Sequence, residues 1–225
     1  RIAEQFKDQV KKYNTKIYVI VPGPNTRENF KKELLNSTGE TYLKNKEALN
    51  QMTKAEVERE KKAAIYAAIQ YYKILSYKTF YKKVLGEKIV EKKIVGDSKI
   101  KSSYRKTAEG EYERELVVDR IVNMNNSILI VDEAHNITGN TFGEALKKII
   151  KNSFNLKIVL LSGTPMKNKG DDIIELINYL RPENDKIDKS LVFNNNTDYN
   201  LDFKENGLKY LKKMMRGYVS HVRGN

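Results

Sequence analysis

The chain has 225 residues, enough for one large α/β domain with a buried core, and 40% of its residues are hydrophobic. Lysine and arginine (42) outnumber aspartate and glutamate (29), and the net charge of +13 favours a polyanionic partner such as nucleic acid, although a lysine-rich composition from an AT-biased genome also explains it. The lack of cysteine excludes disulfides and Cys-ligated metals, the two histidines argue against a His-built zinc site or a Ser-His-Asp triad, and no apolar run approaches the roughly 18 residues that span a bilayer.

The first predicted elements are a helix, a strand and a second helix. Residues 1–13 repeat apolar side chains at helical spacing, and residues 16–21 (KIYVIV) read as a strand. The segment 21–24 (VPGP) breaks this strand. Asn25 or Thr26 can then cap the next helix, which has an apolar face. A β-strand that turns directly into a helix is therefore expected here.

The next part of the chain combines a long helix, a short strand and several tyrosines. We expect a helix over residues 54–72 and a strand over residues 74–76. The tyrosines lie beside lysines, and they are Tyr71, Tyr72, Tyr77 and Tyr81. Such tyrosines can stack on nucleic-acid bases, but half-buried anchors of helices are the favoured interpretation.

Residues 86–110 have the least regular pattern and are interpreted as an insertion at the edge of the domain. Residues 88–95 (KIVEKKIV) can form a β-ribbon, whereas residues 97–108 are charged. A basic insertion can grip a duplex, but a solvated loop is the favoured account. Residues 111–123 are predicted to be helical.

The central signal of the sequence is residues 127–136, SILIVDEAHN. Four apolar residues in a row indicate a strand buried on both faces of a parallel sheet. The strand ends in Asp132 and Glu133, at the sheet edge where ligands bind in open α/β folds. One carboxylate there can hold Mg²⁺ through its waters, while its neighbour orients the water that attacks a γ-phosphate.

A second strand end carries the matching chemistry. Residues 158–161 form another apolar run, followed by Ser162-Gly163-Thr164, and residues 142–150 between the two strands repeat apolar residues at helical spacing. This β-α-β unit should bring Asp132, Glu133, Ser162 and Thr164 to one edge of one sheet. The alternative is an ordinary α/β unit with polar loops.

The last third of the chain is predicted to contain two more helices. Acidic residues at 171 and 172 begin a helix with a buried face, because the helix dipole favours negative charge there. Residues 185–200 are expected to form a loop around a short strand, Leu191–Phe193. A final helix over residues 201–216 is expected to face inward with Leu208, Leu211 and Met215.

These motifs resemble those of a known superfamily. DEAH followed by SGTP resembles motifs II and III of superfamily 2 DEAH-box helicases, and residues 160–182 (LLSGTPMKNKGDDIIELINYLRP) are similar to the Snf2-like branch. The chain also resembles helicase-like transcription ATPases of large cytoplasmic DNA viruses, the type that includes the poxvirus early transcription factor small subunit. The resemblance covers most of the chain and is strongest at residues 16–35 and 128–182. It implies an α/β, RecA-like three-layer fold with a mainly parallel central sheet flanked by helices.

The resemblance implies roles for the two strand ends. ATP would be bound at Asp132, Glu133, Ser162 and Thr164, with Asp132 holding Mg²⁺ through water. The catalytic residues would be Glu133, which positions or deprotonates the attacking water, together with Asp132 and His135. His135 would signal the nucleotide state to the Ser162/Thr164 loop; a buried histidine with a satisfied hydrogen bond is the plainer alternative.

The resemblance also implies a nucleic-acid contact, with DNA favoured over RNA. The stretch VPGPNTRENFKKEL resembles motif Ia and contributes Pro22, Gly23, Asn25, Thr26 and Arg27. The stretch ILSYKTF resembles motif Ib and contributes Tyr77 and Lys78. A helix N-terminus offers backbone amides to phosphates, but a plain β-α turn explains motif Ia equally well.

Residues 1–225 are accordingly interpreted as part of the N-terminal, ATP-binding RecA-like lobe. The sequence contains no G-x-x-x-x-G-K-[ST] loop, so we expect that loop before residue 1 and a second RecA-like lobe with an arginine finger after residue 225. The chain alone would then bind ATP poorly and be inactive. RNA polymerase or other transcription factors are further expected partners, without a membrane, in the host cytoplasm or the virion. The rival functions are a non-catalytic nucleic-acid or transcription-complex binding domain, and the motor lobe of a restriction or remodelling enzyme.

Overall fold

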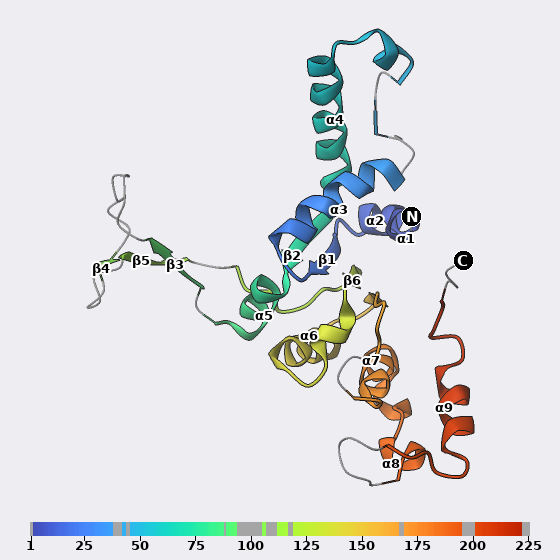
Figure 1. Ribbon diagram of the computed structural model, residues 1–225. Helices are drawn as coiled ribbons and strands as arrows, with labels where there is room; N and C mark the ends of the chain where they lie inside the picture. Colours follow the sequence, from blue (N-terminus) through green and yellow to red (C-terminus); the bar gives the residue numbers. More distant parts are fainter. Residues whose placement is uncertain are drawn as a thin grey trace.

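The computed structural model describes residues 2–37, 42–43, 46–87, 89–93, 105–106, 112–116, 119–166, 169–194 and 201–221 (Figure 1). Its helices are α1 (Ile2–Gln5), α2 (Lys7–Lys12), α3 (Pro24–Ser37), α4 (Lys54–Ile69), α5 (Tyr77–Leu85), α6 (Thr141–Asn152), α7 (Asp172–Leu180), α8 (Lys189–Val192) and α9 (Gly207–Met215), with the 3-10 helices η1 (Lys46–Gln51), η2 (Ala134–Ile137) and η3 (Glu183–Asp185). Its strands are β1 (Ile17–Val21), β2 (Tyr72–Ser76), β3 (Ile89–Lys93), β4 (Arg105–Lys106), β5 (Tyr112–Leu116), β6 (Ile128–Val131) and β7 (Lys157–Leu160).

A parallel sheet in the order β2-β1-β6-β7 forms the centre of the molecule. Val19 of β1 is in register with both Ile74 of β2 and Ile130 of β6, and Ile130 is in register with Val159 of β7. Parallel neighbours need long crossover connections, and α3 with α4 connect β1 to β2 while α6 connects β6 to β7. The carboxyl ends of all four strands therefore lie at one edge of the sheet.

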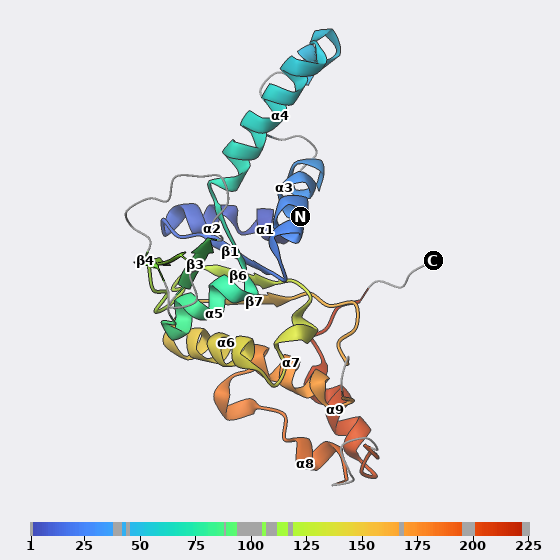
Figure 2. The same ribbon diagram turned by 60° about the vertical axis from the view of Figure 1, so that its left-hand side comes forward.

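Helices cover both faces of this sheet (Figure 2). On one face, buried residues of α2, α3 and α4 pack against β1, β2 and β6, and this core contains Val10, Leu34, Ala68, Val19, Ile74 and Ile128. On the other face, α5, α6 and α7 pack against the sheet, and that core contains Phe80, Val84, Leu146, Ile149, Leu176, Leu129 and Val131. Successive side chains of a strand point to opposite faces of the sheet, so each strand contributes residues to both cores. The RecA-like three-layer α/β fold expected from the sequence is confirmed.

The two strands predicted to be fully buried differ. All four residues of β6 are buried, as expected for a central strand, whereas Lys157 of β7 is exposed and the rest of β7 is half-buried. Leu161, predicted to end the second buried strand, is 42% exposed. The prediction of full burial was wrong for β7, which lies at an edge of the sheet in the described part of the chain.

Two predictions near the start of the chain need correction. Residues 1–13 do not form one helix, since α1 and α2 are separated at Phe6. Neither Asn25 nor Thr26 caps α3, because the helix already begins at Pro24. Proline suits a first helical position, where its fixed φ is helical and no amide hydrogen is needed.

The predicted helix over residues 111–123 is wrong. Residues 112–116 form β5, which pairs antiparallel with β3 and β4 in a small separate sheet that projects from the body (Figure 1). Strand pairing with β3 outweighs the local helical spacing, as is common for β-structure. The ribbon expected near residues 88–95 is present as β3, while residue 88 and residues 94–95 lie outside the described residues.

The C-terminal part also differs from its predicted elements. The strand expected at Leu191–Phe193 is the short helix α8, which the Asp188 side chain begins by accepting a 2.8 Å hydrogen bond from the Ser190 amide. Leu211 is buried as expected, but Leu208 is 43% exposed. The helix α9 begins only at Gly207, and Met215 at its end packs against the same core as Leu211. These helices form a satellite core whose buried members are Ile174, Ile177, Ile187, Val192, Phe193 and Leu211.

The long helix α4 extends away from the sheet (Figure 2). It begins with a capping box, in which Thr53 and Glu56 satisfy each other's backbone amides. Its buried residues are Ala64 and Ala68, on the side that faces α3 and β2. None of the helices in the described ranges has the length and apolar character that a membrane crossing requires.

A carboxylate and two tyrosines tie the first helix to the sheet. Glu4 accepts hydrogen bonds from the hydroxyls of Tyr42 (2.6 Å) and Tyr72, and it pairs with Lys7 at 3.5 Å. Burial raises the pKa of Glu4, but the two hydroxyl donors and the Lys7 charge outweigh it, so that the pKa is lower than that of an ordinary glutamate. The charged form of Glu4 therefore stabilises the fold.

Replacing Glu4 with glutamine is expected to lower the free energy of unfolding at neutral pH and to flatten its dependence on pH in acid. Because the pKa is lower in the folded than in the unfolded chain, the contribution of Glu4 is complete above its ordinary pKa of 4.5 and is lost as the pH falls through the folded value. Urea unfolding of both proteins between neutral pH and pH 3 measures this. The exposed Glu58→Gln on α4 is the control, and a wild-type advantage independent of pH would contradict the prediction.

Candidate functional site

Four strand ends meet at the carboxyl edge of the sheet. The amide of Asp132, just after β6, donates to the carbonyl of Ile20 in β1 at 2.9 Å. The amide of Leu161, just after β7, donates to the carbonyl of Val131 at 2.8 Å, and the Ala134 amide returns a 2.8 Å bond to the Leu161 carbonyl. The loops after β6 and β7 are therefore fixed to each other by backbone hydrogen bonds at this edge.

The acid pair has an unusual backbone. Glu133 has a φ of 51° and lies in the left-handed region, which is costly for a residue with a side chain. Its own amide donates to the Asp132 carboxylate at 3.1 Å, and its carbonyl accepts bonds from the amide and the side-chain amide of Asn136 at 3.0 and 3.1 Å. Such strained residues often occur at active sites, where the surrounding contacts hold a side chain in position.

The hydroxyl of Tyr77 holds the same backbone from the other side. Tyr77 is the first residue of α5, directly after β2, and its side chain is 4% exposed. The hydroxyl donates to the carbonyl of Asp132 and lies 3.0 Å from that of Glu133. Its ring stacks on Phe142 with a centroid distance of 5.2 Å. Burial, followed by the nearby charges of Asp132 and Glu133, raises the pKa of Tyr77, so that the hydroxyl stays protonated as a donor.

Replacing Tyr77 with phenylalanine is expected to lower the free energy of unfolding by about 1 kcal/mol, because the Asp132 carbonyl loses its hydroxyl donor. The ring packing on Phe142 is kept. Thermal unfolding measures the loss, and Tyr66→Phe is the matched control because the Tyr66 side chain on α4 is 79% exposed. Equal stability of the Tyr77→Phe variant and the wild type would contradict the assigned contact.

His135 joins the acid pair to the loop after β7. The ring is 7% exposed, and its Nδ1 lies 2.9 Å from the Ser162 hydroxyl and 3.4 Å from the Thr164 hydroxyl. The same nitrogen is 3.4 Å from a carboxylate oxygen of Glu133, and the Thr164 amide donates to the Ser162 hydroxyl at 3.2 Å. One imidazole nitrogen thus faces groups from both strand ends, and its hydrogen bond also agrees with the plainer interpretation of a satisfied buried histidine.

The two carboxylates fit a site for Mg²⁺ that is completed by phosphate oxygens and water. Burial and the neighbouring charge of Glu133 raise the pKa of Asp132 against the opposing hydrogen bond from the Glu133 amide, with burial the largest cause. A bound cation would favour the ionised form. Within the described ranges no group of three or more His, Asp or Glu residues forms a metal cage. Mg²⁺ is commonly held through only one or two carboxylates plus substrate phosphates, and this edge supplies the carboxylates of Asp132 and Glu133.

The residues predicted to contact nucleic acid lie at two neighbouring strand ends. Pro22 and Gly23 follow β1, while Asn25, Thr26 and Arg27 lie in the first turn of α3. Pro22, Asn25 and Arg27 are exposed, as is Lys78 at the start of α5. Tyr77 differs from these residues, since its buried hydroxyl faces the acid pair and leaves little of the ring for a base. The anchor interpretation of the tyrosines agrees with this placement, and the other contacts stay predictions.

The sequence correctly predicted that the strand-end residues lie at one edge of the sheet, but it did not predict the contacts that hold them there. The structure places Asp132, Glu133, His135, Ser162 and Thr164 at one edge, as expected. The contribution of Tyr77 to this network was missed, because a hydroxyl that reaches two carbonyls across the sheet edge leaves no local pattern. Asn140, which caps α6 through bonds to the amides of Phe142 and Gly143, had the ordinary signal of a capping residue.

The sequence is similar to one family of domains and to several viral proteins. The family described as SNF2-related domain matches residues 3–222. A protein of Acanthamoeba polyphaga mimivirus, provisionally named ATP-dependent RNA helicase L377, is 53% identical over 224 residues, which cover 99% of this chain and 19% of that protein. The early transcription factor 70 kDa subunits of Yaba monkey tumor virus and of vaccinia virus (strain Ankara) are 35% and 36% identical over 97 residues, covering 43% of this chain and 15% of each subunit. The chain thus spans about a fifth or less of these curated relatives.

Proposed function

The chain belongs to the family of SNF2-related domains, and from this premise we propose that it works as the first motor lobe of an ATP-driven helicase or translocase. The observation that carries the proposal is the network at the carboxyl edge of the sheet. Nδ1 of the His135 ring lies 2.9 Å from the Ser162 hydroxyl and 3.4 Å from both the Thr164 hydroxyl and the Glu133 carboxylate. The Asp132 carboxylate accepts a 3.1 Å hydrogen bond from the Glu133 amide beside this ring. Acids and hydroxyls on one edge suit phosphoryl transfer to water.

Each side chain has a role in this proposal. Asp132 would hold Mg²⁺ through water, and the metal would supply charge neutralisation on the phosphates. Glu133 would orient the attacking water and accept its proton, since its side chain is half-exposed beside Asp132. His135 would report the state of this site to Ser162 and Thr164, its two hydroxyl neighbours. Ser162 and Thr164 complete the proposed ATP contact.

The proposal requires further parts of the full-length protein. The 225-residue sequence lacks the G-x-x-x-x-G-K-[ST] loop that cradles phosphates, so this loop would come from another segment. An arginine finger would come from a second RecA-like lobe, because phosphoryl transfer depends on positive charge at the transition state. We infer that residues 1–225 form one lobe with an insertion that starts at residue 86. Pairing of β3 with β5 supports an insertion that extends beyond residue 110 to Leu116.

Nucleic acid is the proposed substrate of the motor, with DNA favoured over RNA. The exposed start of α3 and Lys78 of α5 would contact the sugar-phosphate backbone. The names of the relatives point both ways, since one is called an RNA helicase and the others are transcription factor subunits. We infer a role in transcription beside an RNA polymerase or other transcription factors, and the viral relatives suggest the host cytoplasm or the virion as its place.

ATP hydrolysis by the full-length protein tests the proposal. We expect a turnover that depends on Mg²⁺ and rises when nucleic acid is added, with duplex DNA giving a larger rise than RNA of the same length. Phosphate release with each nucleic acid measures both effects. Equal stimulation by DNA and RNA would remove the preference for DNA. Binding of nucleic acid without any hydrolysis would contradict the motor and leave a non-catalytic binding domain.

A further inference from the structure

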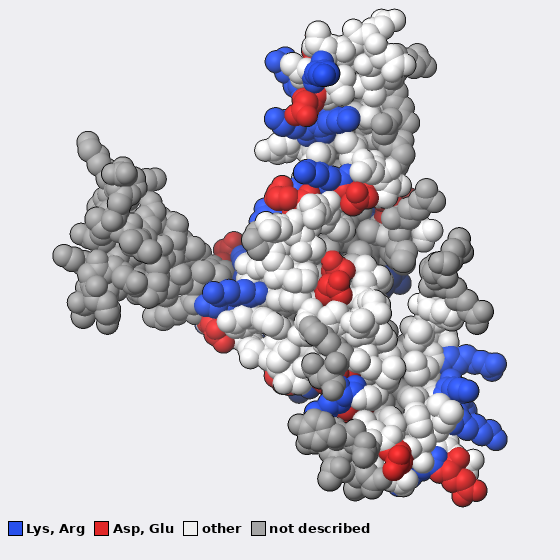
Figure 3. Space-filling view, in the orientation of Figure 1, with Lys and Arg blue, Asp and Glu red and all other residues white. Residues whose placement is uncertain are grey.

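The outward face of α9 carries a continuous row of cations. Lys209, Lys212 and Lys213 lie on one side of α9, and Arg216 directly follows the helix as its C-cap residue, three positions after Lys213. We call this row the α9 cationic stripe. All four residues are exposed, and in the space-filling view the blue side chains gather over the position of α9 (Figure 3). With a rise of 1.5 Å per residue, the stripe spans about 10 Å.

The orientation of the stripe is fixed by the opposite face of the helix. Leu211 is buried in the satellite core, and Tyr210, Met214 and Met215 pack against that core. The buried guanidinium of Arg181, at the end of α7, donates to the Met214 carbonyl at 2.7 Å and to the Asp185 carbonyl at 2.5 Å. Because α9 is held from this side, its cations must face solvent or a partner.

The cations have no acidic partner in the described part of the chain. None of the ion pairs there involves the stripe, and the first turn of α9 contains no acidic residue. Like charges three and four residues apart destabilise a helix. The helix dipole favours positive charge in the last turn but opposes it at Lys209 in the first. The repulsion within the stripe and the unfavourable position of Lys209 therefore oppose the gain that the dipole gives at Lys212 and Lys213.

The helix α4 provides a contrast within the same molecule. Its four exposed cations, Lys54, Arg59, Lys61 and Lys62, are interspersed with Glu56, Glu58 and Glu60. Alternating signs are typical of a solvated helix and give no net attraction for a polyanion. The stripe and this part of α4 each contain four cations, so that the difference lies in the acidic residues between them.

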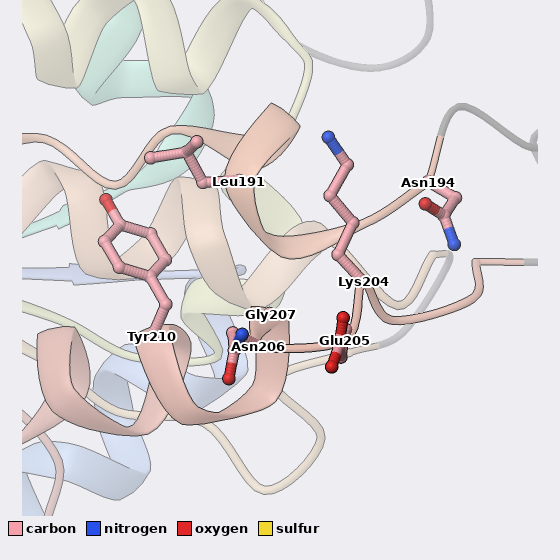
Figure 4. A pocket seen from close by; sticks show the side chains of 7 residues that line it. All are labelled: Leu191, Asn194, Lys204, Glu205, Asn206, Gly207 and Tyr210. Carbon is pink, nitrogen blue, oxygen red and sulfur yellow. The ribbon is translucent and has the colours of Figure 1, made fainter.

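Two neighbouring hollows border the stripe. One of about 680 Å³ is lined by the four stripe residues with Asn206 and Tyr210, so its lining contains no acidic residue. The other, of about 530 Å³, lies between α8 and α9, with Tyr210 and Leu191 on one side and Lys204 on the other (Figure 4). Asn194 and Glu205 also border it (Figure 4). A positive surface with an aromatic and an apolar residue beside it suits a nucleic-acid strand.

We propose that the α9 cationic stripe binds the sugar-phosphate backbone of nucleic acid, as a second contact separate from the carboxyl edge of the sheet. Phosphates along one strand of a duplex are 3.4 Å apart on the axis, so a row of about 10 Å meets about three of them. This proposal rests on the nucleic-acid binding of the motor but not on its hydrolysis of ATP. The stripe would hold the substrate while the edge of the sheet changes state.

The test measures binding of a labelled DNA duplex to the full-length protein without nucleotide. Fluorescence anisotropy over a range of salt concentrations gives the affinity. The stripe variant carries Lys209→Gln, Lys212→Gln, Lys213→Gln and Arg216→Gln. The control variant carries Lys54→Gln, Arg59→Gln, Lys61→Gln and Lys62→Gln, which change the net charge by the same amount. We expect the stripe variant to bind about 100-fold more weakly at 0.1 M salt, with a log–log salt slope smaller by about 3, and the control variant to lose less than about threefold.

Each other outcome overturns the proposal. Equal losses in the two variants would mean that only net charge matters, and no loss in the stripe variant would place the contact elsewhere. A polyglutamate that binds through the stripe, while duplex binding does not depend on it, would identify an acidic protein partner instead. Circular dichroism and thermal unfolding check the fold, and the milder pair Lys209→Gln and Lys213→Gln, with an expected loss of about tenfold, serves if the fourfold variant does not fold.

Failure of the stripe proposal can be distinguished from failure of the proposed motor function. Glu133→Gln should keep stripe-dependent binding, because binding needs no hydrolysis. Stripe-dependent binding by a protein that never hydrolyses ATP would contradict the motor alone. Hydrolysis stimulated by DNA, with duplex affinity unchanged in the stripe variant, would contradict the stripe alone.

Discussion

Replacing Glu133 with glutamine is expected to reduce ATP hydrolysis by the full-length protein by about 10³-fold while leaving ATP binding intact. A positioned general base contributes 10² to 10⁴ in rate, and glutamine removes the basic oxygen without changing the size of the side chain. The amide can still lie near Nδ1 of His135, where the carboxylate oxygen now lies at 3.4 Å. Steady-state phosphate release and equilibrium binding of a fluorescent ATP analogue measure the two effects.

The matched control is Glu183→Gln, since the Glu183 side chain is 95% exposed and forms a surface ion pair with Lys186 at 3.4 Å. It should hydrolyse ATP at the wild-type rate. Asp132→Asn should differ from Glu133→Gln, because it weakens the Mg²⁺-dependent part of nucleotide binding as well as hydrolysis. Unchanged hydrolysis in the Glu133→Gln variant would contradict the motor and reduce the DEAH sequence to a structural turn.

Replacing Gly143 with alanine is expected to lower the free energy of unfolding by about 3 kcal/mol, because the site has no room for a methyl group. A Cβ at this position would lie 2.5 Å from the Tyr179 hydroxyl and closer still to the Ile137 carbonyl. Ile137 ends η2, the turn that contains His135, and the Tyr179 hydroxyl donates to Glu175 at 2.7 Å. The methyl group must therefore displace either the DEAH turn or this hydrogen bond.

Thermal unfolding of the chain measures the effect of Gly143→Ala, with an expected fall in Tm of about 6–12 °C for a domain of this size. Gly163→Ala is the control for stability, since a Cβ there meets no atom within 4 Å. It should change the Tm by less than about 2 °C. A Gly143→Ala variant as stable as the control would show that η2 yields easily, against the tight packing described here.

The parts of the fold that were predictable have patterns that local physics determines. The unbroken run Ile128–Val131 must be buried on both faces, and such a strand implies a parallel sheet with helical crossovers. Once the sheet is parallel, Asp132 and Ser162 must lie at one edge, because both follow the carboxyl ends of neighbouring strands. The placement of the site residues therefore followed from topology alone.

The parts that could not be predicted depend on contacts between distant segments. The strand β5 forms because β3 pairs with it, although residues 112 and 116 also have helical spacing. The short helix α8 begins at a capping aspartate within a polar stretch that reads as loop. The hydroxyl of Tyr77 reaches carbonyls that lie 55 and 56 residues further along the chain, and sequence spacing contains no information about such a bond.

The position of Tyr77 has a mechanical consequence. Its Cα opens α5, which also carries the exposed Lys78, while its hydroxyl grips the peptide planes on both sides of the strained Glu133 backbone. If Lys78 contacts nucleic acid as proposed, a force on α5 would be transmitted through the Tyr77 ring to those planes. It would then either tilt the Glu133 side chain or break the bond. The Tyr77 ring would thus couple a force on the nucleic acid to the orientation of the Glu133 carboxylate.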